Sequence, residues 1–261
     1  MKSFNYHSAK DSKEASKLSS SNSAFLAGGM TTIPSMKLGL ASYKDIIDIK
    51  GIKKLSGIKV SGKSVIIGAI TKHFEVANSK DVKKAIPSLA LLAEGIGDPQ
   101  VRNRGTIGGS IANNDPSADY PSACIALDAI VHTNERKIEA SKFFKGMFET
   151  ALKKGELIEA IEFKVPEKSS YQKHPNPASR YAVVGVYVAK HKNGTIVAVT
   201  GAKPCVYNDK DLAKALDSNF SANSILGMKL KSSDMNSDIH ASAEYRANLV
   251  VIQAKKAVEA C

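Results

Sequence analysis

Two loops of small residues are the parts of this chain whose composition best suits ligand-binding chemistry. The first runs from Leu26 to Ile33 and reads Leu-Ala-Gly-Gly-Met-Thr-Thr-Ile, and the second lies around Gly108 and Gly109. Glycine has no Cβ, so its backbone can turn through positive φ and come close to a ligand. Successive N–H groups in such a turn form an anion-binding nest. Two loops of this kind predict one elongated anionic ligand that is bound at its centre. A dinucleotide, with its pyrophosphate in the middle, fits that description.

The elements that must position these loops alternate between short strands and helices. Short apolar runs predict strands at Phe25-Leu26, at Ile46 to Ile49 and at Val65 to Ala69. Pro34 predicts a helical turn directly after the first loop, because proline is favoured in the first turn of a helix. Thr71 is expected to cap the helix that follows the third strand.

The second half of the chain predicts a helix, a boundary and a hairpin. A helix is expected over Pro116 to Leu127, with Asp115 as its N-cap. The polar segment Glu167 to Pro177 contains two prolines and is interpreted as a domain boundary. A long apolar strand over Tyr181 to Lys190 leads into Asn193-Gly194, a sequence that favours a type I′ hairpin turn. An apolar stripe with helical spacing predicts a final helix.

Composition narrows the class of protein. The chain has 261 residues, is 43% hydrophobic and carries a formal net charge of +12. Its basic residues are scattered and it has no tryptophan, so nucleic-acid binding is not favoured. The three cysteines are far apart, and an iron–sulfur cluster usually needs four clustered thiolates. No histidine has the spacing of a metal ligand. No apolar run is long enough to span a membrane. Because the N-terminus also lacks the apolar core of a signal peptide, we expect a cytoplasmic protein.

The residues in and around both loops resemble one flavoprotein family. The segment Ala27 to Leu40, AGGMTTIPSMKLGL, and the segment Gln100 to Pro121, QVRNRGTIGGSIANNDPSADYP, are similar to the two flavin loops of the FAD-binding medium subunit of molybdenum hydroxylases. Carbon monoxide dehydrogenase and xanthine dehydrogenase belong to that family. The similarity extends from Phe4 to Leu249. It implies an α+β fold: a two-subdomain FAD-binding fold of the vanillyl-alcohol oxidase type, over residues 1–55 and 56–167. A small C-terminal domain of antiparallel sheet and helices would follow over 168–261.

The resemblance also implies which residues hold FAD. Asp119 matches a carboxylate that binds a ribose hydroxyl, Ile158 matches a strand position whose backbone meets the flavin ring, and Lys173 matches a lysine close to FAD. Gly108 is expected to lie against the pyrophosphate with positive φ, so that a side chain there would clash with it. The remaining residues implied by the two loops are Ala27, Gly28, Gly29, Met30, Thr31, Thr32, Ile33, Thr106, Ile107, Gly109 and Ser110.

The sequence departs from the family pattern at three places. Ser110 replaces the usual asparagine, Met30 stands where glutamine or histidine is common, and the segment Pro177 to Tyr181 replaces an Arg-Arg-x-Gly-Asp motif. These differences concern the flavin surroundings and the electron acceptor rather than the fold. No histidine lies in either loop, so FAD is expected to be bound non-covalently.

The function implied by the resemblance is that of an electron-transfer subunit. A large subunit would hold a molybdenum–pterin centre, a small subunit would hold [2Fe–2S] clusters, and this chain would pass their electrons from FAD to an external acceptor. A dimer of such heterotrimers is the expected assembly. The alternative is a stand-alone flavin oxidase or dehydrogenase of the vanillyl-alcohol oxidase type, although the C-terminal residues supply little for a substrate domain. The substrate is not encoded here, because it would bind the large subunit.

Overall fold

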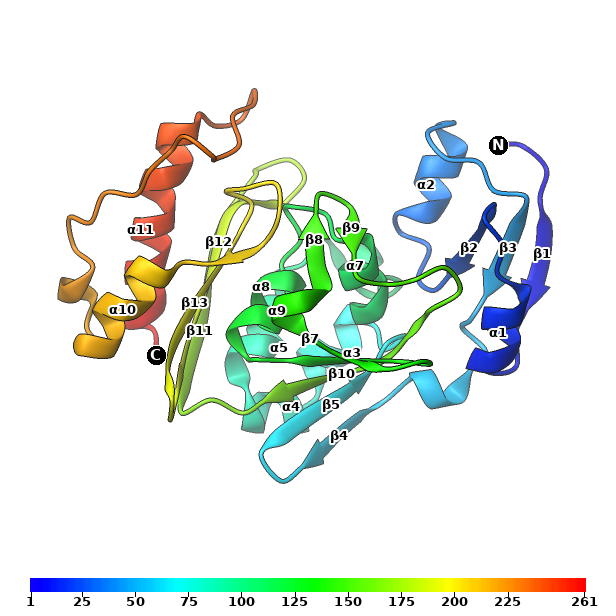
Figure 1. The fold of residues 1–261 in the computed structure, drawn as a ribbon, viewed down its shortest axis with the longest axis horizontal. Helices are drawn as coiled ribbons and strands as arrows, with labels where there is room; N and C mark the ends of the chain where they lie inside the picture. Colours follow the sequence, from blue (N-terminus) through cyan, green and yellow to red (C-terminus); the bar gives the residue numbers. More distant parts are fainter.

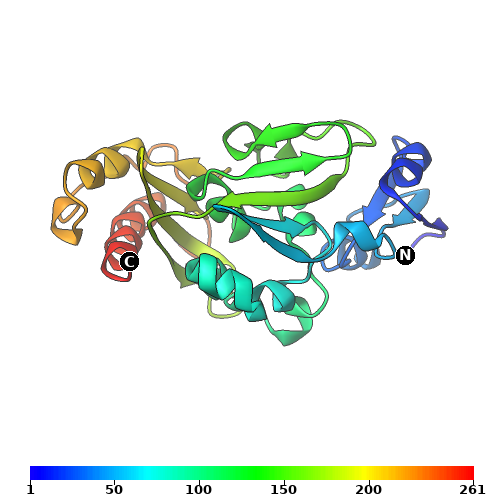
Figure 2. The same ribbon diagram turned by 90° about the horizontal axis from the view of Figure 1, so that it is seen from below.

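The computed structural model describes all 261 residues of the chain. Three main sheets follow one another along the long axis of the molecule in chain order, with the N-terminus at one end and the C-terminal helices at the other (Figure 1). The view from below shows the same sequence of layers (Figure 2). A fourth sheet is a two-stranded hairpin on the central part.

The N-terminal sheet is small and wholly parallel, with the strand order β1-β3-β2. Both crossovers are helical, and the first glycine loop begins where β2 ends. Because ligands of parallel α/β sheets bind beyond the carboxyl ends of the strands, this loop is well placed for one. The elements are β1 (Asn5–Ser8), α1 (Ser12–Leu18), β2 (Ser23–Leu26), α2 (Thr32–Lys37), β3 (Asp45–Asp48) and the 3-10 turn η1 (Lys53–Leu55).

The central part combines an antiparallel sheet, ordered β4-β5-β10-β6-β7, with seven short helices. The second glycine loop forms the start of α7. The strands are β4 (Ile58–Ser61), β5 (Ser64–Gly68), β6 (Ile130–Thr133), β7 (Lys137–Glu139), β8 (Phe144–Gly146), β9 (Glu149–Thr150) and β10 (Ile158–Lys164). The helices are α3 (His73–Asn78), α4 (Lys80–Ala85), α5 (Pro87–Glu94), α6 (Pro99–Arg102), α7 (Ile107–Asn113), α8 (Tyr120–Ala126) and α9 (Ala140–Phe143).

The C-terminal sheet, ordered β11-β12-β13-β14, is antiparallel and packs between two layers of helices. Helices α10 and α11 cover its outer face, and α5 and α8 lie against its inner face. Its elements are β11 (Lys168–Pro175), β12 (Ala182–His191), β13 (Gly194–Thr200), β14 (Tyr207–Asn208), α10 (Lys210–Ser218), η2 (Ala222–Ser224) and α11 (Ala243–Glu259).

Strand β12 explains the long apolar run in the sequence. Tyr187 and Ala189 belong to the central core, whereas Val186 and Val188 on the opposite face belong to the C-terminal core. A strand buried on both faces needs apolar residues at consecutive positions rather than at alternate ones. The two cores are therefore separated by a single sheet.

The segment interpreted as a domain boundary forms a strand. Lys168–Pro175 forms β11, which pairs along its length with β12. Its polar residues are mostly half-buried, as suits an edge strand, and Pro175 lies beyond a register shift after His174, where the ladder is already interrupted. The polar residues and prolines that suggested a domain boundary are thus accommodated in a strand at a sheet edge.

Three local predictions also need correction. Thr71 does not cap α3. Its hydroxyl accepts a hydrogen bond from Gly57 N at 3.0 Å, and the N-cap position is the next residue, Lys72. Helix α8 begins at Tyr120, so Asp115 is not its cap and instead accepts from Ser117 N in a preceding turn. The β12–β13 hairpin exists, but only Gly194 has positive φ, 131°, so its two-residue turn is not type I′.

Candidate cofactor site

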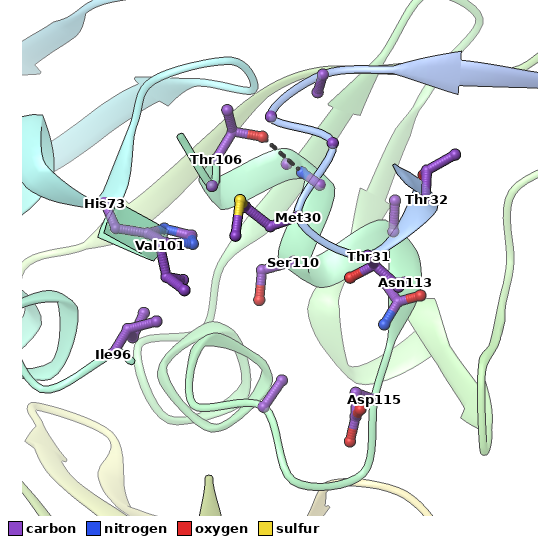
Figure 3. Close-up of a pocket in the computed structure, with 18 of the residues that line it drawn as sticks. Met30, Thr31, Thr32, His73, Ile96, Val101, Thr106, Ser110, Asn113 and Asp115 are labelled. Atoms are coloured by element: carbon purple, nitrogen blue, oxygen red, sulfur yellow. Dashed lines mark hydrogen bonds between the residues drawn. The ribbon is translucent and has the colours of Figure 1, made fainter. Parts of the chain in front are cut away.

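A cavity of about 650 Å³ lies where the two glycine loops meet. This volume falls within the range of small-molecule and cofactor sites. Met30 and Thr31 of the first loop face Ser110 and Asn113 of α7 across it (Figure 3). Twelve of the fifteen residues predicted from sequence line it, namely Ala27, Gly28, Gly29, Met30, Thr31, Thr32, Thr106, Gly108, Gly109, Ser110, Asp119 and Ile158.

The first glycine loop presents unpaired backbone donors. None of the N–H groups of residues 27–32 donates a hydrogen bond within the chain, and the next residue, Ile33, donates to Gly29 O at 3.1 Å. Gly29 has φ of 75°, a conformation that glycine adopts without strain. Because free N–H groups are strong donors, this loop can bind an anionic ligand through its backbone.

Gly28 has a different reason to be glycine. A Cβ there would collide with the carbonyl oxygen of Arg104 and with the backbone of Gly105. Only glycine therefore allows the first loop to run directly against the residues before the second. The side chain of the predicted residue Ile33 packs beside Leu26 and Met36 and does not line the cavity.

The second glycine loop is bonded internally and packed against β5. Thr106 caps α7, accepting from Gly109 N at 3.1 Å. Gly108 donates to Ala69 O at 2.8 Å, and a Cβ on Gly108 would lie 2.6 Å from that oxygen. A Cβ on Gly109 would meet only the Thr106 hydroxyl, at 2.9 Å, and Ala27 Cβ, at 4.0 Å. Ile107 is fully buried in the central core.

The reason given above for Gly108 is therefore wrong. Its φ is not positive, and a side chain on it would meet Ala69, the residue directly after β5, before any ligand. Gly108 still lines the cavity, but its lack of a side chain is required by the contact between α7 and Ala69.

Asp119 and Lys173, predicted separately, form one buried ion pair. Lys173 Nζ lies 3.0 Å from Asp119 Oδ1 and also donates to Gly95 O at 2.9 Å. The Tyr171 hydroxyl donates to the same carboxylate. Burial raises the pKa of Asp119, and Lys173 and Tyr171 act against that rise. Asp119 lines the cavity and Lys173 does not, so the lysine acts on any ligand through the carboxylate.

The wall around Ile158 is held by a buried carboxylate. The Glu156 carboxylate accepts hydrogen bonds from Arg136 Nε at 2.9 Å, from the Thr133 hydroxyl at 2.7 Å and from Lys153 N at 2.8 Å. Burial alone would raise the pKa of Glu156, but these hydrogen bonds lower it to about 2. Glu156 and Ile158 both line the cavity, so the network fixes this wall in place.

One part of the cavity wall was not predicted from sequence, and another was predicted only through the family resemblance. His73, Ile96 and Val101 line one side together, because Lys72 pairs with Thr106 across an isolated bridge and brings the start of α3 to the second loop. The turn between β11 and β12 also lines the cavity, and its Arg180 donates to Gly97 O at 3.1 Å. No local sequence signal predicts either contact, since both join distant segments.

No group of three or more histidine, cysteine or acidic side chains in the chain could hold a metal ion. All three cysteines are free thiols in the structure. No helix combines the length and the apolarity needed to cross a membrane.

Residues 2–167, which contain both glycine loops, match the family described as FAD binding domain in molybdopterin dehydrogenase. The chain belongs to this family. It is 34% identical to the glyceraldehyde dehydrogenase medium chain of Sulfolobus acidocaldarius, over 97% of this chain and 96% of that one. It is 37% identical to the carbon monoxide dehydrogenase medium chain of Hydrogenophaga pseudoflava, over 75% of this chain and 71% of that one.

The fold of the chain is also similar to that of a solved structure from the same family. Carbon monoxide dehydrogenase from Hydrogenophaga pseudoflava, in a form that lacks the Mo-pyranopterin moiety of its molybdenum cofactor, superposes with a TM-score of 0.89. The match has 31% sequence identity and covers 99% of this chain and 97% of that one. The chain is thus an FAD-binding medium subunit of the molybdenum hydroxylase type, as the loop sequences predicted, and a stand-alone flavin oxidase is not favoured.

Proposed function

We propose that this chain binds FAD non-covalently in the cavity between its glycine loops. The observation that carries the proposal is the run of unpaired N–H groups over residues 27–32, all of which line a cavity of about 650 Å³. These donors suit the two phosphates of FAD, which need several hydrogen bonds in one place. When bound, FAD supplies the redox chemistry, and the protein supplies binding and orientation.

The roles of individual residues follow from their positions. The first loop binds the pyrophosphate through its backbone, and Gly109 and Ser110 close the opposite side. Asp119 accepts a hydrogen bond from a ribose hydroxyl, while Lys173 and Tyr171 hold its carboxylate in position. The backbone at Ile158 meets the flavin ring, on the wall that Glu156 fixes. Residues 1–55 and 56–167 form the two halves of a vanillyl-alcohol oxidase type of fold, and residues 168–261 complete it.

The subunit works within a larger enzyme. A large partner subunit carries a molybdenum–pterin centre and oxidises the substrate, and a small partner subunit carries [2Fe–2S] clusters. Electrons pass from those clusters to FAD on this chain and then to an external acceptor. Two relatives named as medium chains support this division, and the heterotrimer is expected to dimerise.

Acid precipitation tests the cofactor part of the proposal. The purified chain, after reconstitution with FAD if necessary, should release a yellow supernatant that contains an adenine flavin. Colour that stays in the pellet would contradict non-covalent binding. A wild-type chain that binds no added FAD would overturn the site.

Reconstitution tests the subunit role. The isolated chain should leave glyceraldehyde and carbon monoxide unoxidised, although dithionite should reduce its flavin. The addition of both partner subunits should give substrate-dependent reduction of a dye. Turnover of either substrate by the isolated chain would favour the stand-alone enzyme, and the mass of the reconstituted complex would test the dimer of heterotrimers.

A further inference from the structure

His73 is a buried polar side chain without a partner in the cavity wall. It is 5% exposed, neither ring nitrogen makes a hydrogen bond in the chain, and Nδ1 is fully enclosed. The ring lies against Gly105, the residue before the second glycine loop, because a Cβ on Gly105 would come within 2.6 Å of Nε2. Buried polar atoms are nearly always hydrogen-bonded, so an unpartnered imidazole beside a ligand cavity needs an explanation.

Apolar side chains line the cavity around His73. Ile96 and Val101 lie beside the imidazole in the cavity wall, and Met30 of the first loop faces it (Figure 3). Tyr120 backs the imidazole at a ring-centroid distance of 5.4 Å and does not line the cavity. Apolar side chains can cover the faces of a heteroaromatic ring, while a single polar group can bind its edge.

The charge state of His73 suits a neutral partner. Burial, helped by the nearby Arg102 guanidinium, lowers the pKa of His73 to about 4. The imidazole is therefore neutral near pH 7, with one N–H donor and one acceptor nitrogen. A neutral imidazole matches the donor and acceptor edge of a ring system better than it matches a phosphate, for which a cation is preferred.

We propose that His73 binds the polar edge of one of the two ring systems of FAD, the isoalloxazine or the adenine. The inference rests on the proposed FAD site and adds a residue that neither glycine loop contains. His73 is a cofactor-positioning residue: its Nε2 makes no hydrogen bond in the chain and, unlike Nδ1, is not fully enclosed, so Nε2 forms a hydrogen bond to the cofactor when it is present. The bond fixes how the ring lies between Ile96, Val101 and Met30.

Equilibrium titration of FAD into the apo chain tests this role. His73→Leu removes the hydrogen-bonding group and should raise the Kd by about tenfold, the equivalent of one neutral hydrogen bond. His73→Gln keeps a polar group near the position of Nε2 and should recover part of the affinity. Phe74→Leu is the matched control, because Phe74 is the next residue of α3, is 47% exposed and lies outside the cavity, so its Kd should not change.

Competition and spectra identify the ring. If His73 binds the isoalloxazine, His73→Leu should shift the visible absorption bands of bound FAD and weaken competition by FMN. If it binds the adenine, the spectrum should stay the same and competition by ADP should weaken. Either pattern supports the inference. Unchanged FAD affinity and unchanged competition by both fragments in His73→Leu would overturn it.

The stability of the apo chain separates this role from a structural one. Because the apo protein leaves Nδ1 unpaired, His73→Leu should leave the apo melting temperature unchanged or higher. If its apo chain melts lower while its Kd for FAD equals that of the wild type, His73 is structural and the inference fails. If the wild-type chain itself binds no FAD, the proposed function fails instead, and the two failures are distinguishable.

Discussion

The two glycine loops have nearly the same composition but differ in what their glycines do. In the first loop, residues 27–32 leave their N–H groups free and Gly29 turns through positive φ. In the second, Gly108 and Gly109 donate hydrogen bonds within the chain, to Ala69 O and Thr106 Oγ1. The first loop is thus organised for a ligand and the second for packing against the sheet. A Gly-Gly pair in a binding motif does not by itself indicate contact with phosphate.

The largest effect that separates the loops should come from Gly108→Val. The branched side chain would meet Ala69 at distances that no packed core accepts, so the free energy of unfolding should fall by about 3 kcal/mol or more. Urea unfolding of the apo chain measures this loss. Gly109→Ala is the comparison, because its Cβ would meet only the Thr106 hydroxyl at 2.9 Å. A Gly108→Val chain that folds as stably as the apo wild type and loses only FAD would restore the pyrophosphate interpretation.

FAD should slow amide hydrogen exchange in the first loop more than in the second. At a hundredfold excess over its Kd, it should raise the free energy of unfolding by about 2.7 kcal/mol. Amide hydrogen exchange should be fast over residues 27–32 in the apo chain and slow after FAD is added, because those N–H groups then gain acceptors. Gly108 and Ser110 are already bonded and should be protected in both states. Equal protection of the two loops in the apo chain would refute the contrast.

The neighbourhood of the second loop should also make stability depend on pH. The pKa of His73 falls from its ordinary value of 6.5 to about 4 on folding, so the unfolded chain binds more protons between these values. Stability should therefore rise with pH in this window, and from pH 5 to pH 6.5 His73 should contribute about 2 kcal/mol. Urea unfolding of apo wild type and His73→Leu at both pH values measures it.

The pH slope of the His73→Leu variant should be shallower than that of the wild type. Glu156 provides a separate check at lower pH, because its pKa is lowered from 4.5 to about 2. Its contribution is present above pH 4.5 and is lost as the pH falls through that lower window. Parallel pH profiles of wild type and His73→Leu above pH 5 would contradict the buried, neutral state of His73.

The smallest effect concerns the cap of the second loop. Thr106→Ala removes the acceptor for Gly109 N and should lower the free energy of unfolding by about 1 kcal/mol. Thr106→Ser keeps the hydroxyl and should retain most of the stability. The first loop has no equivalent, because Thr31 at the start of α2 makes no side-chain capping bond, so Thr31→Ala should leave the apo stability nearly unchanged. Similar losses from both alanine variants would remove the distinction.

The sequence predicted those parts of the site whose signals are local. Both glycine loops, the strand before the first and the apolar stretch of β12 could be found because small-residue turns and apolar runs leave clear patterns. His73 could not, since the neighbouring Lys72 pairs with Thr106, far along the chain. The segment Pro177 to Tyr181 was linked to the flavin surroundings only through the family resemblance, because the contact of Arg180 with Gly97 leaves no local pattern. Strand β11 was not predicted within the segment interpreted as a boundary, because an edge strand tolerates the polar residues and prolines that are also typical of boundaries.

The double burial of β12 has a consequence for how the molecule can be divided. The family match ends at residue 167, yet Tyr187, Ala189 and Ala198, which lie beyond that point, belong to the same core as Val65 and Leu89. A chain cut after residue 167 would expose that apolar surface to water. The two halves are therefore expected to melt in one cooperative transition, and the flavin-binding half to aggregate when produced alone. Exchange of C-terminal halves between relatives should succeed only when the inward-facing residues of β12 and β13 are exchanged with their contacts.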